Sequence, residues 1–190
     1  MHKIHITEGI VLEKRAVGEA SVRVTLLTQE LGLLRAAARS TRVPQSKLRY
    51  GLETLTMARF CLVRGKHEWR LTGVENPIRA LGESSRSRAT AGRIAQLLLR
   101  LVTGEEPFPN LYKDVSEGLA LLASPGISAP ESIEVVLVLR VLSHLGYLPA
   151  TPALAPFVES EFSLDLSAKA LESKALLVRT INESLRATGL

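Results

Sequence analysis

The hydrophobic period of this chain changes once, near Pro77, and this change constrains the fold more than any other feature. Before it, short runs of β-branched and aliphatic residues are separated by turn residues, a pattern typical of strands. After it, apolar residues recur every three or four positions, a pattern typical of helices. The sequence therefore predicts an α+β protein, with a strand domain over residues 1–78 and an all-helical domain over residues 79–190.

Five strands are expected in the first domain. They cover residues 4–12, 22–28, 33–38, 55–63 and 68–74. Short turns join the second strand to the third and the fourth to the fifth, and a polar, Pro-containing stretch over residues 39–49 is typical of a long loop. Five short strands favour a small Greek-key barrel, and the OB-fold is its common nucleic-acid-binding form. An SH3-like barrel is the alternative.

Four helices are expected in the second domain. They cover residues 86–102, 110–123, 130–145 and 167–186, with a Pro-containing connector over residues 149–157. The third is apolar nearly all round, so it should lie at the centre, and Gly146 should end it. Four such helices can form one bundle.

Basic residues are concentrated in the strand domain. The net charge of the chain is +5, but residues 1–80 hold 14 basic and 7 acidic side chains, while residues 81–190 hold 10 and 12. This asymmetry predicts a polyanionic partner for the first domain.

The stretch from Arg35 to Arg49 holds the densest group of cations, with no acidic residue between Glu30 and Glu53. Cations on one loop can neutralise neighbouring phosphates and release counterions. A solvated loop without a partner explains the same composition. The candidate DNA-binding residues are Arg35, Arg39, Arg42, Lys47 and Arg49 here, Lys14 and Arg15 at the end of the first strand, and Arg64 and Lys66 in the last turn.

Aromatic residues are scarce, at 4% of the chain. Tyr50, Phe60 and Trp69 fall in the basic half and could stack on bases. Trp69 shares a strand face with Leu71, which favours core packing for its ring.

The sequence contains no recognisable enzyme motif. Phosphate-binding glycine loops and a nucleophile elbow are absent, and the four histidines (His2, His5, His67 and His144) have no metal-binding spacing. Cys61 is the only cysteine, so an intrachain disulfide and a thiolate-rich zinc site are excluded, and its apolar neighbours favour a small buried residue over a reactive thiol. We expect no catalytic residue, no metal and no cofactor.

No membrane segment is expected. The most apolar run, residues 133–142, is interrupted by Glu134 and Arg140 and is too short to span a bilayer. The N-terminus lacks the apolar region of a secretory signal, so a cytoplasmic location is expected.

Several motifs of this chain occur in one order that is typical of a known family. They are Thr7–Leu12, Gly18–Ser21, Val24–Thr28, Gly32–Leu34, Ala38–Ser40, Pro44–Arg49, Leu52–Glu53, Arg64–Gly65 and, in the helical part, Leu145–Pro149. The series resembles the RecO proteins, DNA repair and recombination mediators of bacteria.

This resemblance implies an OB-fold followed by a helical domain in a protein that is not an enzyme. It also implies binding of single- and double-stranded DNA, annealing of complementary strands, and action with RecR on DNA coated by single-strand-binding protein, where the family helps RecA to load during repair of DNA damage. The location would be the bacterial cytoplasm, at the nucleoid. By position, Arg39, Lys47 and Arg49 match the family's basic segment.

Two further expectations follow from the resemblance. Many relatives carry two CxxC pairs after the Gly-Tyr motif, but Thr151–Phe157 holds no cysteine, so zinc should be absent. The tail of single-strand-binding protein is acidic with an apolar end, and Arg140, among Val138, Leu139, Val141 and Leu142, is the candidate residue to receive it. Alternatively, Arg140 packs its stem at the core edge. The alternatives for the whole chain are a general OB-fold RNA-binding protein and a protein-interaction scaffold without nucleic-acid contact.

Overall fold

The structure is a computed structural model that describes residues 3–17, 19, 21–39, 48 and 50–187. The chain forms two compact units, one of residues 1–80 with 95–112 and one of residues 81–94 with 113–190. We call them the barrel unit and the helical unit. The division passes through two helices, and the domain boundary expected after residue 78 stays a prediction.

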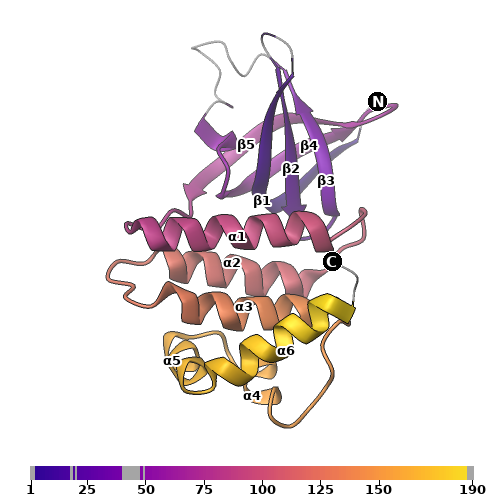
Figure 1. Cartoon of the computed structure of the whole chain (residues 1–190). Coiled ribbons are helices and arrows are strands. Elements are labelled where there is room, and N and C mark those ends of the chain that lie inside the picture. Colours follow the sequence, from indigo (N-terminus) through magenta and orange to yellow (C-terminus); the bar gives the residue numbers. More distant parts are fainter. Residues whose placement is uncertain (1–2, 18, 20, 40–47, 49, 188–190) are drawn as a thin grey trace. The chain divides into compact units, whose positions relative to one another are not determined.

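Five strands form a closed barrel in the order β1–β2–β3–β5–β4 (Figure 1). They are β1 (Ile4–Val17), β2 (Ser21–Thr28), β3 (Gly32–Ala38), β4 (Thr56–Arg64) and β5 (Trp69–Arg79), with a 3-10 turn, η1, at Tyr50–Leu52. All neighbouring strands are antiparallel except β3 and β5, which are parallel. The predicted α+β fold with an N-terminal five-stranded barrel is confirmed, although β1 and β5 continue past their expected ends.

Alternation along the strands builds the barrel core. Val22, Val24 and Leu26 of β2 face inward, and so do Leu34 and Ala36 of β3. The residues between them therefore face outward, because successive side chains of a strand point to opposite faces. This alternation places Arg23 and Arg35 outside the barrel.

The seam between β3 and β5 is short. These strands pair only at Ala36–Trp69 and Ala37–Arg70. Beyond the seam, the amide of Leu33 donates a hydrogen bond to the carbonyl oxygen of Gly104 at 3.0 Å. Gly32 has a φ of +69°, and a Cβ atom there would overlap the backbone of Glu106, so glycine is needed at this position for two reasons.

Six helices follow the barrel strands in the described residues. They are α1 (Ser85–Leu101), α2 (Pro109–Ala123), α3 (Pro130–His144), α4 (Ala155–Glu159), α5 (Leu164–Glu172) and α6 (Lys174–Ala187). Helix α3 is buried along most of its length and packs against α4, α5 and α6, so its predicted central position is confirmed. Within the described part of the chain, every helix is too short or too polar to traverse a lipid bilayer.

The expectation of one last helix over residues 167–186 is wrong. The chain forms α5 and α6 there, with a break at Ser173. Helix α5 also begins earlier, because the Ser163 side chain accepts a hydrogen bond from the amide of Leu166 and caps its N-terminus. The buried residues Leu166, Ala170 and Leu177 keep helical spacing across the break, so the apolar pattern carries no sign of it. The expected connector over residues 149–157 likewise includes the start of α4.

Candidate nucleic-acid interface

Four arginines lie on the outside of the barrel on adjacent strands. Arg15 of β1 pairs with Arg23 of β2, Arg23 pairs with Ala37 of β3, and Ala37 pairs with Arg70 of β5. Paired residues lie on the same face of a sheet, so these positions form one row around the barrel. Arg35 lies in the neighbouring row, opposite Thr25. We call Arg15, Arg23, Arg35 and Arg70, all exposed, the arginine face.

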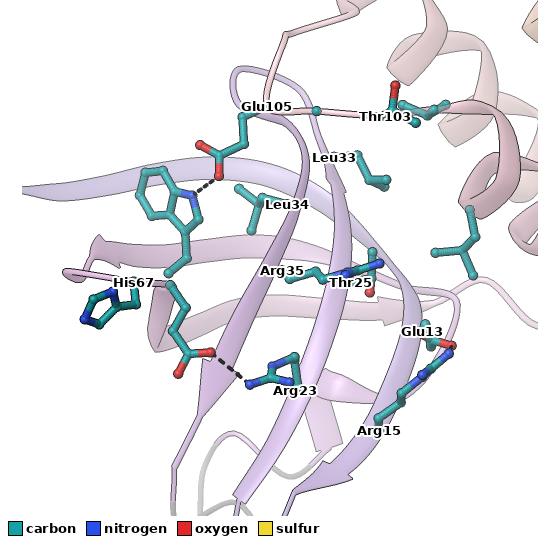
Figure 2. Close-up of a pocket in the computed structure, with 15 residues that line it drawn as sticks. Glu13, Arg15, Arg23, Thr25, Leu33, Leu34, Arg35, His67, Thr103 and Glu105 are labelled. Carbon is teal, nitrogen blue, oxygen red and sulfur yellow. Dashed lines mark hydrogen bonds and ion pairs between the residues drawn. The ribbon is translucent and has the colours of Figure 1, made fainter.

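A hollow of about 700 Å³ lies on this side of the barrel unit (Figure 2). Arg15, Arg23 and Arg35 line it, together with Trp69 and the loop segment Thr103–Glu105. Adjacent strands are about 4.8 Å apart, so the arginines are close enough together to contact neighbouring phosphates of one nucleic-acid strand.

Two of these arginines are held by carboxylates and two are not. Arg15 lies 2.8 Å from Glu13, and Arg23 lies 3.2 Å from Glu68. Within the described part of the chain, Arg35 and Arg70 form no ion pair. Exposed ion pairs contribute only about 0–1 kcal/mol, so a phosphate can compete for the paired arginines as well. The face can therefore bind an anionic backbone.

The structure brings together some of the candidates predicted from the sequence. Arg15 and Arg35 belong to the arginine face, and Arg39 is exposed immediately after β3. Arg42, Lys47 and Arg49 lie outside the described residues.

The other three candidates have different surroundings. The Lys14 ammonium lies 2.7 Å from Glu53, and because Lys14 pairs with the buried Val24 it does not share the face of Arg15. The Arg64 guanidinium lies 2.7 Å from Glu105 and 5.2 Å from the ring centre of Trp69. Lys66 is exposed after β4 and has no ion pair among the described residues. The candidates thus do not all meet at one site.

Sequence reasoning missed Arg23 and Arg70. Each stands between two inward-facing residues, Arg23 between Val22 and Val24, and Arg70 between Trp69 and Leu71. The alternation of buried and exposed residues along each strand is enough to predict that both arginines lie outside the barrel. The pairing that puts them in one row is a long-range property that the pattern of a single strand does not contain.

The barrel aromatics are mostly buried. Phe60 is 0% exposed, so it cannot stack on a base. Trp69 is 4% exposed and belongs to the core, as its alternation with polar neighbours predicts. The side chain of Tyr50 lies outside what the structure describes. The arrangement therefore favours contact with phosphates over stacking on bases.

Arg140 lies in the helical unit and is 4% exposed. Its guanidinium lies 2.7 Å from Asp114, donates to the carbonyl oxygens of Phe157 and Ser160, and stands over the ring of Phe162. Receiving an acidic peptide requires a guanidinium that the peptide can reach, and this one is enclosed. The contacts instead support a structural role, as the alternative of a packed stem expects, but the charged head is buried as well rather than in water.

Asp114 contacts both basic side chains of this cluster, Arg140 and His144. Its second oxygen lies 2.6 Å from Nε2 of His144, one helical turn beyond Arg140 on α3. Burial alone would raise the pKa of Asp114, but hydrogen bonds from His144 and Arg140 outweigh it and hold this pKa below its ordinary value. Asp114 is therefore a charged anchor between α2 and α3.

Cys61 lies on the outer side of β4, paired with Gly73, and is half-buried rather than fully buried as expected. Burial and the neighbouring Glu75 carboxylate raise the pKa of its thiol, which disfavours the reactive thiolate. The described residues contain no group of three His, Cys, Asp or Glu side chains that could hold a metal ion.

Two models of one protein family match consecutive parts of the chain. The family model "Recombination protein O N terminal" matches residues 1–76, and the model "Recombination protein O C terminal" matches residues 86–153. The chain belongs to the RecO family. This membership places it among proteins of DNA repair and recombination.

Curated RecO proteins match the chain over much of its length. The DNA repair protein RecO of Heliobacterium modesticaldum is 33% identical over 153 residues, which cover 77% of this chain and 53% of the relative. Those of Synechocystis sp. and Pelotomaculum thermopropionicum are 32% and 31% identical, covering 64% and 77% of this chain and 46% and 57% of the relatives. The chain spans about half the length of the curated RecO proteins it matches.

Proposed function

We propose that this RecO family member binds single- and double-stranded DNA through its barrel, anneals complementary strands, and acts with RecR to help RecA load on DNA coated by single-strand-binding protein. It would do so in the bacterial cytoplasm, at the nucleoid. The observation that carries the DNA-binding part is the arginine face, a group of exposed cations in two neighbouring rows on adjacent strands. The steps with RecR, RecA and single-strand-binding protein rest on family membership.

The arginine face supports a mechanism based on charge. Each arginine that meets a phosphate releases a condensed counterion, and this release drives binding. Cations on the protein also lower the repulsion between two phosphate backbones, so complementary strands can approach and pair without a covalent step. Contacts of this kind carry little information about base sequence.

The basic segment after β3 supports a second contact region. Arg39, Arg42, Lys47 and Arg49 follow β3 directly in the sequence, and β3 carries Arg35 of the arginine face. Lys66 and, after release from their carboxylates, Lys14 and Arg64 would add to the binding charge. We assign no residue to the docking of RecR or of the tail of single-strand-binding protein, because Arg140 is enclosed.

The test is fluorescence anisotropy of labelled single- and double-stranded oligonucleotides over a range of salt concentrations. A face variant, R15A/R23A/R35A/R70A, is compared with a loop variant, R39A/R42A/K47A/R49A. The matched control, K113A/K169A/R179A/R186A, removes the same four charges from exposed positions of the helical unit. A labelled RNA of equal length tests whether the surface distinguishes RNA from DNA.

We expect the face variant to bind more weakly, with a salt slope for single strands that falls by about 0.7 for each phosphate that the protein no longer neutralises. The control should keep the wild-type slope. If the face variant behaves as the control does, the interface lies elsewhere. Absence of binding by the wild-type protein at low salt would refute DNA binding altogether.

A further inference from the structure

The carboxylate of Glu105 is bound by two donors of the barrel. Its Oε1 accepts a hydrogen bond of 3.0 Å from Nε1 of Trp69, and its Oε2 lies 2.7 Å from Nη1 of Arg64 (Figure 2 shows the first contact). The two donors come from β5 and the end of β4. Trp69 is also contacted edge-on by the ring of His5, at 5.2 Å between ring centres, so its indole N–H is held in place.

The loop that carries Glu105 is fixed on both sides of this residue. The carbonyl oxygen of Gly104 accepts from the amide of Leu33 at 3.0 Å, and the backbone of Glu106 packs against Gly32. The side chain of Glu105 is nevertheless 42% exposed. It can therefore leave its two donors by rotating into solvent, without a movement of the loop.

The donors match an oxyanion other than a carboxylate equally well. A guanidinium and an indole N–H that converge on two oxygens of one group offer the same pattern to two oxygens of a phosphate. Glu105 and Trp69 line the hollow that Arg15, Arg23 and Arg35 also line. A strand held on the arginine face thus brings its phosphates close to this pair of donors.

We infer that Arg64 and Trp69 form a phosphate subsite of the strand-binding surface, and that Glu105 is the resident anion that a phosphodiester group displaces. The inference rests on the proposed function, because the ligand is a phosphate of a bound nucleic-acid strand. Without a strand, Glu105 keeps the enclosed indole N–H hydrogen-bonded, as buried donors require. When a strand binds, the weak, exposed ion pair between Arg64 and Glu105 is replaced by a contact between Arg64 and a phosphate.

Trp69 is the only tryptophan of the chain, so its intrinsic fluorescence reports on the subsite alone. The protein is titrated with an unlabelled thymidine oligonucleotide while anisotropy is followed in parallel with a labelled one. We expect the emission of Trp69 to change with the same midpoint as the anisotropy and to revert when salt is added. Inorganic phosphate should give the same change only at far higher concentration, because it lacks the contacts to the arginine face.

The decisive variant is E105Q, which removes the charge and keeps a carbonyl oxygen for the indole N–H. The matched control is E106Q, which changes the net charge equally at the next position, where the carboxylate forms no ion pair with a described residue. We expect E105Q to bind single strands roughly two- to fivefold more tightly than E106Q, as release of one exposed ion pair allows. Its salt slope should be steeper by about 0.7.

The variant R64Q completes the comparison. The double variant E105Q/R64Q should lose the gain in affinity of E105Q, because it lacks the Arg64 guanidinium that Glu105 contacts in the unaltered protein. Thermal unfolding followed by circular dichroism shows whether each variant is folded, and the Trp69 titration of the unaltered protein does not depend on any substitution.

The outcomes separate the subsite from the proposed function. Strand binding in the anisotropy assay with unchanged Trp69 emission and equal affinities for E105Q and E106Q overturns the subsite and leaves DNA binding intact. A gain that persists in E105Q/R64Q also overturns it, because the gain would then not involve Arg64. No strand binding at low salt overturns both.

Discussion

Arg35 and Arg140 have similar neighbours in the sequence but opposite environments in the structure. Each stands between aliphatic residues, Leu34 and Ala36 in one case and Leu139 and Val141 in the other. Arg35, on a barrel strand, is exposed and unpaired among the described residues, whereas Arg140, in the helical unit, is enclosed and bound to Asp114. Local composition is thus a poor guide to whether an arginine is available to a ligand.

The difference arises from the geometry of the two elements. On a strand that packs on one side, alternation sends every second residue to solvent, so the position of Arg35 follows from its neighbours. A helix that is apolar all round has no solvent side, and a cation in it must find a partner inside. Asp114 supplies that partner from 26 positions earlier in the chain.

The largest effect is expected when the free energy of unfolding of R140M is compared with that of R35M. Removal of one partner from a buried ion pair costs about 3–5 kcal/mol, and His144 still contacts the Asp114 carboxylate, so we expect a loss of about 3 kcal/mol. R35M, at an exposed position, should change the free energy of unfolding by at most about 0.5 kcal/mol. Urea unfolding measures both values. Equal losses would contradict the distinction between the two arginines.

A second test uses pH. The pKa of Asp114 is lowered in the folded protein, so the carboxylate contributes stability above its unfolded pKa of about 3.9, and this contribution is lost as the pH falls through the folded value. We expect the stability difference between wild type and D114N to shrink as the pH falls through the folded pKa of Asp114. Unfolding free energies from pH 7 to pH 3 give this difference. A difference independent of pH would show that Asp114 acts without its charge.

The smallest expected effect comes from adding a cation to each region. Ala37 lies in the row between Arg23 and Arg70, so A37R should steepen the salt slope of single-strand binding by about 0.7. The matched change A120R, at an exposed position of α2, should leave the slope unaltered. Repulsion from Arg23 should make A37R slightly less stable, since like charges opposite each other in a sheet are unfavourable. Equal slopes for the two variants would remove the basis for a localised interface.

Local patterns were sufficient to predict the strands, the first three helices and the core position of Trp69. They could not predict the break at Ser173, because the apolar spacing continues through it. The contact between Arg64 and Glu105 joins residues 41 positions apart and depends on how the loop after α1 meets the barrel. The row of arginines likewise required the strand pairing, and the pairing is set by the closed barrel as a whole.

The short seam between β3 and β5 has a consequence for self-association. A bare strand edge is a template on which a second copy of the chain can add its own strand and begin to aggregate. At the start of β3 this template is occupied, because the amide of Leu33 is bound to Gly104 and the backbone of Glu106 covers Gly32. We therefore expect this end of β3 to be closed to strand addition by a second copy of the chain.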